Sequence, residues 1–130
     1  MTGSTVIPTL RYRDAARAIH FLCTAFGLER QFVVPGTERA IEHAQVTLGS
    51  GMVMLGSLPD GATPQTGPGI YCVVADVDAH HAQAVAAGAS IETPPRETDY
   101  GSREYAARDL EGHLWHFGTY DPWARPSGET

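Results

Sequence analysis

The sequence predicts an α+β fold in which two βαβββ modules form a curved mixed sheet, shaped as a cup, with the helices outside. Two observations predict this class. In each half an acidic residue follows a strand-like segment, a short amphipathic helix comes next, and a glycine, Gly27 or Gly88, ends it. Three further strand-like segments then follow each helix. One half is too small to bury its own sheet, so the two halves should pack around one core.

The first half begins with a strand-like segment at residues 6–12, followed by Asp14, a residue type that caps helix N-termini. Apolar residues then recur three and four positions apart and predict one buried helical face: Ala15, Ala18, Ile19, Leu22, Cys23 and Phe26. Strands are expected at residues 29–34, 41–48 and 52–57, with a hairpin turn at residues 49–51.

The second half repeats this order. Residues 70–74 predict a buried strand, and Asp78 is expected to cap a helix whose apolar side carries Ala79, Ala82, Val85 and Ala86. Strands are expected near residues 90–92, 103–108 and 114–120. We therefore divide the chain into a first module (residues 1–58), a Gly/Pro-rich linker (59–68), a second module (69–122) and a tail (123–130).

The composition argues against several kinds of partner. The chain has 130 residues, a net charge of −6 and no basic cluster, so nucleic acid is not expected. No segment approaches the roughly 18 consecutive apolar residues of a membrane span. The first residues lack the basic start and apolar run of a secretory signal, so a cytoplasmic location is expected. Cys23 and Cys72 lie in apolar segments and are expected to be buried and reduced, and Cys72, with no basic residue nearby in sequence, is not expected to be a nucleophile.

Two stretches resemble a known family. RYRDAARAIHFLCTAFGLE resembles its first strand-helix unit, and YGSREYAARDLEGHLWHFGTY resembles its last hairpin. The family is the vicinal-oxygen-chelate superfamily, which includes glyoxalase I, extradiol dioxygenases, fosfomycin-resistance enzymes and bleomycin-binding proteins. The resemblance spans residues 6–122 and implies the paired βαβββ fold, with a small-molecule site in the cup.

The resemblance also implies where a metal would bind. Metal-dependent members hold one divalent ion with His, Gln and Glu side chains, and the matching positions here are Ile7, Met54, Ile70 and His116. Isoleucine cannot donate to a metal, methionine is a soft ligand, and one histidine alone cannot hold such an ion. We therefore expect no metal, no cofactor and no catalytic residues, as in the drug-binding branch of the family.

Strand alternation and the family match together predict which side chains line the cup. In the seventh strand two faces are open: Arg103, Tyr105 and Ala107, which we prefer, or Glu104, Ala106 and Arg108. Trp115 has the opposite parity from His116 and is expected in the core, while His80 and His81 are expected on a solvated helix face. The predicted ligand contacts are Thr9, Arg11, His43, Gln45, Met54, Ile70, Tyr105, His116 and Tyr120.

These residues favour a binding protein, without catalysis, that sequesters a small aromatic compound such as an antibiotic and forms a homodimer. The cup is mostly apolar with few directional donors, and Arg11 favours neutral or weakly basic ligands over polycationic ones. One alternative is a lyase, isomerase or dioxygenase with an unusual metal set from His43, His116 and Gln45 or Glu42. Another is a metal-free enzyme that uses His116 as a general base.

Overall fold

The computed structural model describes residues 3–64 and 66–124 and confirms the predicted fold class. Each half forms a four-stranded sheet in which the first strand runs parallel to the last and the other neighbours are antiparallel. The first sheet has the order β1-β4-β3-β2 and consists of β1 (Thr9–Tyr12), β2 (Glu29–Pro35), β3 (Ile41–Leu48) and β4 (Gly51–Ser57).

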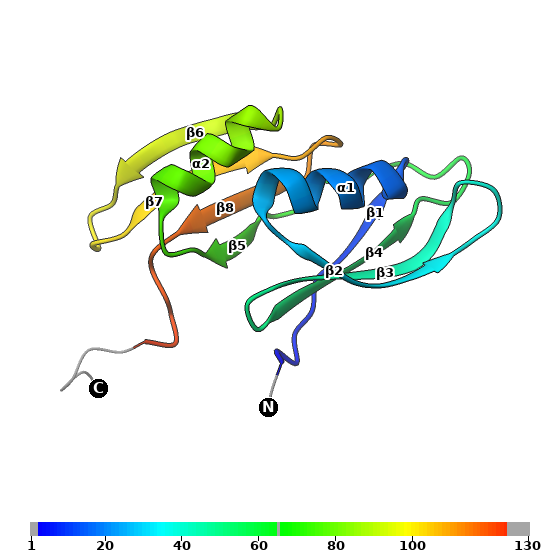
Figure 1. The fold of residues 1–130 in the computed structure, drawn as a ribbon, viewed down its shortest axis with the longest axis horizontal. Helices are drawn as coiled ribbons and strands as arrows, with labels where there is room; N and C mark the ends of the chain where they lie inside the picture. Colours follow the sequence, from blue (N-terminus) through cyan, green and yellow to red (C-terminus); the bar gives the residue numbers. More distant parts are fainter. Residues whose placement is uncertain (1–2, 65, 125–130) are drawn as a thin grey trace.

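The second sheet has the equivalent order, β5-β8-β7-β6. It consists of β5 (Ile70–Val73), β6 (Ser90–Glu97), β7 (Arg103–Arg108) and β8 (Leu114–Gly118). Figure 1 shows the two sheets side by side, with the helices along the middle of the molecule. Of the predicted tail, residues 125–130 lie outside the described residues. Within the described part of the chain, neither helix has the length and apolar character needed to cross a membrane.

Helix α1 (Ala15–Phe26) forms as the sequence predicts. The Asp14 carboxylate accepts a hydrogen bond from the Arg17 amide at 3.1 Å, which satisfies a donor of the first turn. Gly27 follows the helix with φ 78°, a left-handed conformation that glycine adopts without a steric penalty. The apolar side of α1 is buried against all four strands of the first sheet.

Helix α2 (Val77–Ala86) begins earlier than predicted and buries a different face. Its N-terminal cap is Asp76, whose carboxylate accepts from the Ala79 amide at 3.0 Å. Asp78 lies in the first turn and binds Arg103 instead, so the prediction that it caps the helix is wrong. Val85, predicted on the apolar side, is 50% exposed, and the buried residues of α2 are Val77 and Ala84.

The two modules share one core, centred on Phe26 at the end of α1. Its ring lies 5.6 Å from that of Trp115 and 4.8 Å from that of Phe117, both on β8 of the second sheet. Trp115 is fully buried, as predicted. Because a residue of the first module packs on the second sheet, neither half completes its core alone.

The turn before β8 also joins the modules. Asp109 is buried and accepts hydrogen bonds from the Tyr12 hydroxyl at 2.6 Å and the Trp115 indole at 3.0 Å. The Glu111 carboxylate accepts from the backbone amides of Arg13 and Asp14, at the start of α1. These acidic residues therefore hold the second module to the end of β1, in addition to forming their own turn.

Candidate ligand-binding site

Each sheet has one face against its helix and an opposite face, which we call the open face. On the first sheet, the open face carries the predicted residues Thr9, Arg11, His43, Gln45 and Met54, because their neighbours Ala44, Val46, Val53 and Leu55 are buried against α1. The His43 imidazole donates to the Gln45 side-chain oxygen at 2.8 Å, and the Gln45 amide donates to Gln31. These side chains form a polar row along β3 and β2.

On the second sheet, Ile70 lies on the opposite face from the one predicted. The register pairs Ile70 with Trp115 and Tyr71 with His116, so Ile70 packs against the core and Tyr71 lies on the open face. This register buries the two apolar side chains together. It also leaves the Tyr71 hydroxyl free to donate to the Tyr120 carbonyl at 2.8 Å.

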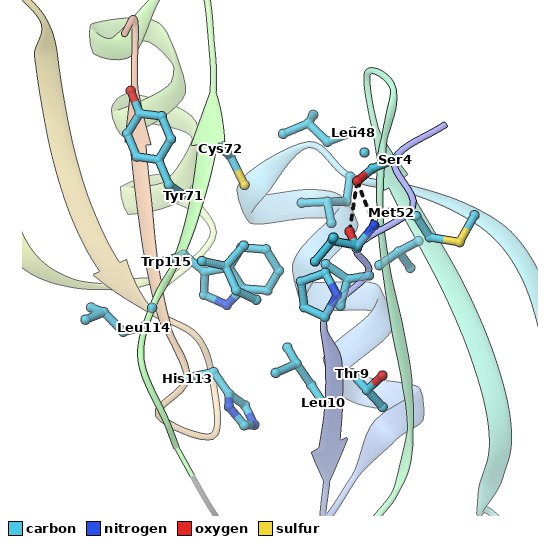
Figure 2. A pocket seen from close by; sticks show the side chains of 18 of the residues that line it. Ser4, Thr9, Leu10, Leu48, Met52, Tyr71, Cys72, His113, Leu114 and Trp115 are labelled. Carbon is cyan, nitrogen blue, oxygen red and sulfur yellow. Dashed lines mark hydrogen bonds between the residues drawn. The ribbon is translucent and has the colours of Figure 1, made fainter. Parts of the chain in front are cut away.

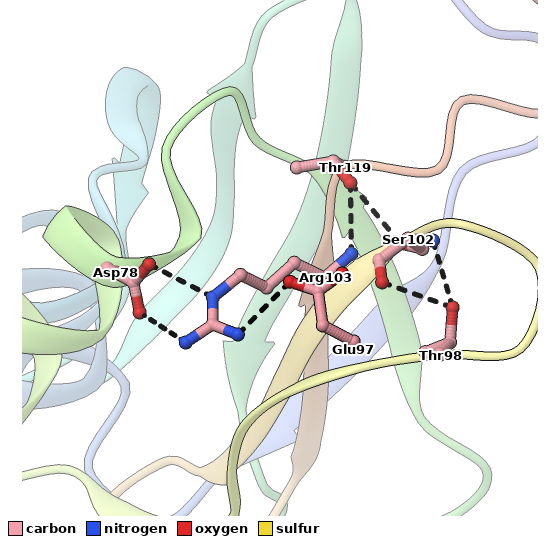
Figure 3. A network of polar contacts seen from close by, with 6 residues as sticks. All are labelled: Asp78, Glu97, Thr98, Ser102, Arg103 and Thr119. Atoms are coloured by element: carbon pink, nitrogen blue, oxygen red, sulfur yellow. Dashed lines mark hydrogen bonds and ion pairs between the residues drawn. The ribbon is translucent and has the colours of Figure 1, made fainter.

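The preferred face of the seventh strand is also wrong. Tyr105 is only 1% exposed and pairs with Phe117, with ring centroids 5.2 Å apart in the core. Arg103 turns toward α2, where its guanidinium binds Asp78 and Glu97 (Figure 3). Glu104, Ala106 and Arg108 therefore share the open face with His116.

His80 explains why Tyr105 turns inward. The His80 Nε2 atom donates to the Phe26 carbonyl at 2.7 Å, and its Nδ1 atom accepts from the Tyr105 hydroxyl at 2.6 Å. Burial lowers the pKa of His80, in agreement with this neutral form. The predicted solvated face is therefore wrong for His80, which joins α2, β7 and the end of α1.

A cavity of about 1120 Å³ lies between the two modules. Figure 2 shows its walls, with β1 and β4 on one side and β5 and β8 on the other. Predicted residues Thr9, Arg11 and Ile70 line it, and Trp123, which is 92% exposed, lies at its margin. The Cys72 thiol also lines the cavity, and burial raises its pKa to about 12. This thiol stays protonated at neutral pH, as the sequence predicts.

A second cavity, which we call the tyrosine hollow, opens on the second sheet and measures about 570 Å³. Predicted residues His116 and Tyr120 line it, together with Tyr71, Tyr100, Glu104 and Pro122. The Tyr100 hydroxyl donates to Glu104 Oε1 at 2.9 Å, and the Tyr71 hydroxyl lies 3.5 Å from Oε2. The rings of Tyr100 and Tyr120 meet edge to face at 5.7 Å. The hollow thus combines aromatic surfaces with one carboxylate and one imidazole.

Two glycines make room for these side chains. A Cβ atom on Gly69 would lie 2.7 Å from the His116 ring, so the imidazole occupies the space above this residue. A Cβ atom on Gly118 would lie 2.6 Å from Glu104 Cγ. Any larger residue at either position would displace a side chain of the tyrosine hollow, because such contacts are shorter than van der Waals separations.

The structure divides the predicted site residues instead of gathering them in one cup. Neither cavity described above is lined by His43, Gln45 or Met54. Sequence reasoning missed Tyr71 because it placed the alternate residues of β5 on the open face. It missed Tyr100 because this residue lies in the turn between β6 and β7, where strand alternation does not predict side-chain direction. Only Glu104 had a signal, since the alternative face of the seventh strand contains it.

The residues present do not fit the divalent metal of the family's enzymes. Of the four matched positions, Ile7 and Ile70 have no donor atom, and Met54 offers only a thioether. Within residues 3–64 and 66–124, no group of three or more His, Cys, Asp or Glu side chains is placed to hold an ion. His116 and Glu104 are hard or borderline donors, but two such donors fall short of the three or four that these sites require.

Comparisons with known proteins agree with this fold. A family model described as Glyoxalase/Bleomycin resistance protein/Dioxygenase superfamily matches residues 5–117. An uncharacterised protein of Mycobacterium bovis is 33% identical over 124 residues, which cover 85% of this chain and 80% of that protein. The crystal structure of TioX from Micromonospora sp. ML1 is 36% identical with a TM-score of 0.74, and the match covers 89% of this chain and 98% of that one.

A more distant structure shows the same fold. A glyoxalase I mutant from Zea mays has a TM-score of 0.74 at 17% identity, with 88% of this chain and 44% of that chain covered. At this identity the likeness concerns the arrangement of strands and helices, and function has to be argued from the residues of the site.

Proposed function

The chain belongs to the Glyoxalase/Bleomycin resistance protein/Dioxygenase superfamily, and from this premise we propose that it binds a partly aromatic small molecule, without a metal, against the open face around His116. The single observation that carries the proposal is the tyrosine hollow. Its three tyrosines offer flat apolar surfaces, while the His116 imidazole and the Glu104 carboxylate supply a few directional polar groups. Ligand pockets typically combine mostly apolar walls with sparse polar groups in this way.

In this proposal the protein forms a homodimer, and the first sheet of one copy covers the tyrosine hollow of the other. The polar row of His43, Gln45 and Gln31 lies on an open face that has no cavity of its own among those described. Both open faces expose large apolar side chains, with Phe32 on the first sheet and Val73 on the second. Exposed apolar side chains on open sheet faces are typical of surfaces that are covered by a partner.

Ligand binding is tested with a screen of aromatic antibiotics by thermal shift, followed by fluorescence titration of every hit. Removing a buried hydrogen-bonding partner costs about 1–3 kcal/mol, so His116→Ala should weaken binding by about 5- to 150-fold. His20→Ala on the exposed side of α1 is the matched control and should leave the affinity unchanged.

Two results would contradict the proposal. Hits whose affinity changes less than about twofold in both His116→Ala and Tyr120→Leu would place binding elsewhere. A hit that is chemically altered by the wild-type protein, but not by His116→Ala, would replace the binding protein with a metal-free enzyme.

The shared site is tested by mixing two defective variants. His43→Ala and His116→Ala should each weaken binding in their own homodimers. If each site uses the two residues from different copies, a refolded equal mixture should regain full affinity at about a quarter of its sites. A monomer in sedimentation at micromolar concentration, or a mixture with no restored sites, would rule out this arrangement.

A further inference from the structure

We propose that the tyrosine hollow recognises a positively charged nitrogen, an organic ammonium group carried by the ligand, with Glu104 as its counter-ion. The inference rests on the proposed binding function and names the chemical class of ligand that the hollow selects. It follows from the missing ion-pair partner of Glu104 among the described residues, from the aromatic rings around it, and from the neutral state of the neighbouring phenols.

The Glu104 carboxylate is held in place by the Tyr100 phenol, not by an ion pair. Tyr100 donates to one oxygen at 2.9 Å, and the Tyr71 hydroxyl lies 3.5 Å from the other. Within the described ranges, the ion pairs of the second module use the acids Asp78, Glu92 and Glu97 with Arg103 and Arg108, and Glu104 takes part in none of them. Arg96 is the cross-strand neighbour of Glu104 on β6, but it is exposed and forms no ion pair with Glu104 among the described residues. A carboxylate fixed in a hollow without an ion-pair partner attracts a cation from solution.

The walls of the hollow suit the same kind of group. Aromatic rings attract cations through the negative faces of their π-systems, and cages of tyrosines bind quaternary ammonium ligands in this way. Tyr100 and Tyr120 meet at an interplanar angle of 80°, and Tyr71 contributes a third ring to the same hollow. An ammonium group seated there would contact ring surface and lie close to the carboxylate.

Tyr71 and Tyr100 stay neutral under ordinary conditions, which keeps their hydroxyls as donors. Burial raises the pKa of Tyr71 above its usual value, and the hydrogen bond to Glu104 raises the pKa of Tyr100. The titratable group that faces them from β8 is His116, which can donate or accept. Within one copy, the cationic Arg11 lies on the first sheet above Gly56, outside the residues that line this hollow, and in the proposed dimer the part of the partner's first sheet that covers the hollow is the polar row.

The test compares choline with its uncharged isostere 3,3-dimethylbutan-1-ol, titrated into the purified protein while tyrosine ring signals are followed by NMR. We expect choline to bind about 5- to 30-fold more tightly than the isostere, the range that a partly desolvated cation–π contact produces. Glu104→Gln keeps the acceptor for Tyr100 but removes the charge, and should lower the preference severalfold while leaving the isostere unchanged, because the cation–π contacts remain. Tyr100→Leu should weaken choline about threefold.

A matched control removes a similar charge elsewhere. Glu29→Gln on β2 changes an exposed glutamate of the first module, so it reports any effect of net charge alone. The inference is overturned if the two probes bind equally, if neither shifts the tyrosine signals, if Glu104→Gln leaves the preference undiminished, or if Glu29→Gln lowers it as much. Neutral aromatic hits that depend on His116 would in those cases still support the proposed function. If choline is preferred but no aromatic compound binds, the inference about the cation stands. The proposed aromatic ligand is then refuted.

Discussion

The two modules have the same backbone plan but oppositely charged side chains above one matching glycine. In the last strand of each module, a glycine lies two residues after the central residue. It is Gly56 after Met54 in β4, and Gly118 after His116 in β8. A long side chain occupies the space above each glycine, which is Arg11 in the first module and Glu104 in the second. The repeated fold therefore determines where side chains are placed, while residue identity puts a guanidinium above Gly56 and a carboxylate above Gly118.

The turns before the closing strands differ in a second way. The first module uses a tight turn at residues 49–50, whereas the second uses residues 109–113, which bind the first module through Asp109 and Glu111. Polar residues next to a candidate site can thus serve the fold alone. The three tests below, which use four variants and their controls, examine this comparison, beginning with the largest expected effect.

Asp109→Ala should lower the free energy of unfolding by about 2–5 kcal/mol, because it leaves the buried Tyr12 hydroxyl and Trp115 indole without their acceptor. Chemical denaturation followed by tryptophan fluorescence measures this change. The equivalent turn of the first module provides the control, since Ser50→Ala should change stability by less than about 0.5 kcal/mol. A loss below about 1 kcal/mol in Asp109→Ala would show that the turn does not join the modules.

Gly56→Ala and Gly118→Ala compare the same position in the two sheets. At Gly56 a Cβ atom would lie 2.9 Å from the backbone oxygen of Glu42, which cannot swing aside, so a loss of about 1–3 kcal/mol is expected. At Gly118 the obstructing atoms belong to the Tyr71 and Glu104 side chains, so stability should fall by less than about 1 kcal/mol.

Calorimetric melting measures both glycine variants, and the choline titration gives a second reading. Gly118→Ala should weaken choline binding because it displaces Glu104, whereas Gly56→Ala should not. Equal melting temperatures for the two variants would mean that the two sheets respond alike at this position.

His80 provides the smallest effect, and it depends on pH. Burial lowers the pKa of folded His80, so protons bind the unfolded chain first, where the pKa is about 6.5. Its contribution to stability is complete above about pH 6.5 and is lost as the pH falls toward the folded pKa. His80→Gln should therefore show a flatter decline of stability than wild type between about pH 7.5 and 5.

Urea denaturation across this pH range checks the His80 prediction. His81→Gln serves as control, because the neighbouring ring contacts only the edge of Tyr105. Parallel pH curves for wild type and His80→Gln would refute it.

The elements of the fold were accessible from sequence because each has a local signal. Asp14 and Gly27 mark both ends of α1, and the predicted bounds of the strand at Ile41–Leu48 agree with the structure. Asp76 and Asp78 are two equally suitable caps two residues apart, and only the end of β5 at Val73 decides between them.

The site was less accessible because alternation defines two faces without saying which one faces the helix. At Tyr105 the choice depends on His80, a partner 25 positions away that supplies the hydrogen bond needed to bury a phenol. At Ile70 it depends on the register with β8, which no local pattern reports. The contacts of Thr9, Arg11, His43, Gln45, Met54, His116 and Tyr120 with a ligand stay predictions.

The bond between Tyr12 and Asp109 has a consequence for how the chain is made. The two residues are 97 positions apart, so β1 and the start of α1 leave the ribosome long before their acidic partners. At about 5–20 residues per second, this delay lasts roughly 5–20 s. During that interval Tyr12 lacks its partners Asp109 and His113 in the turn before β8, and Phe26 at the end of α1 lacks its partners on β8. This interval is a window in which a chaperone could engage nascent chains.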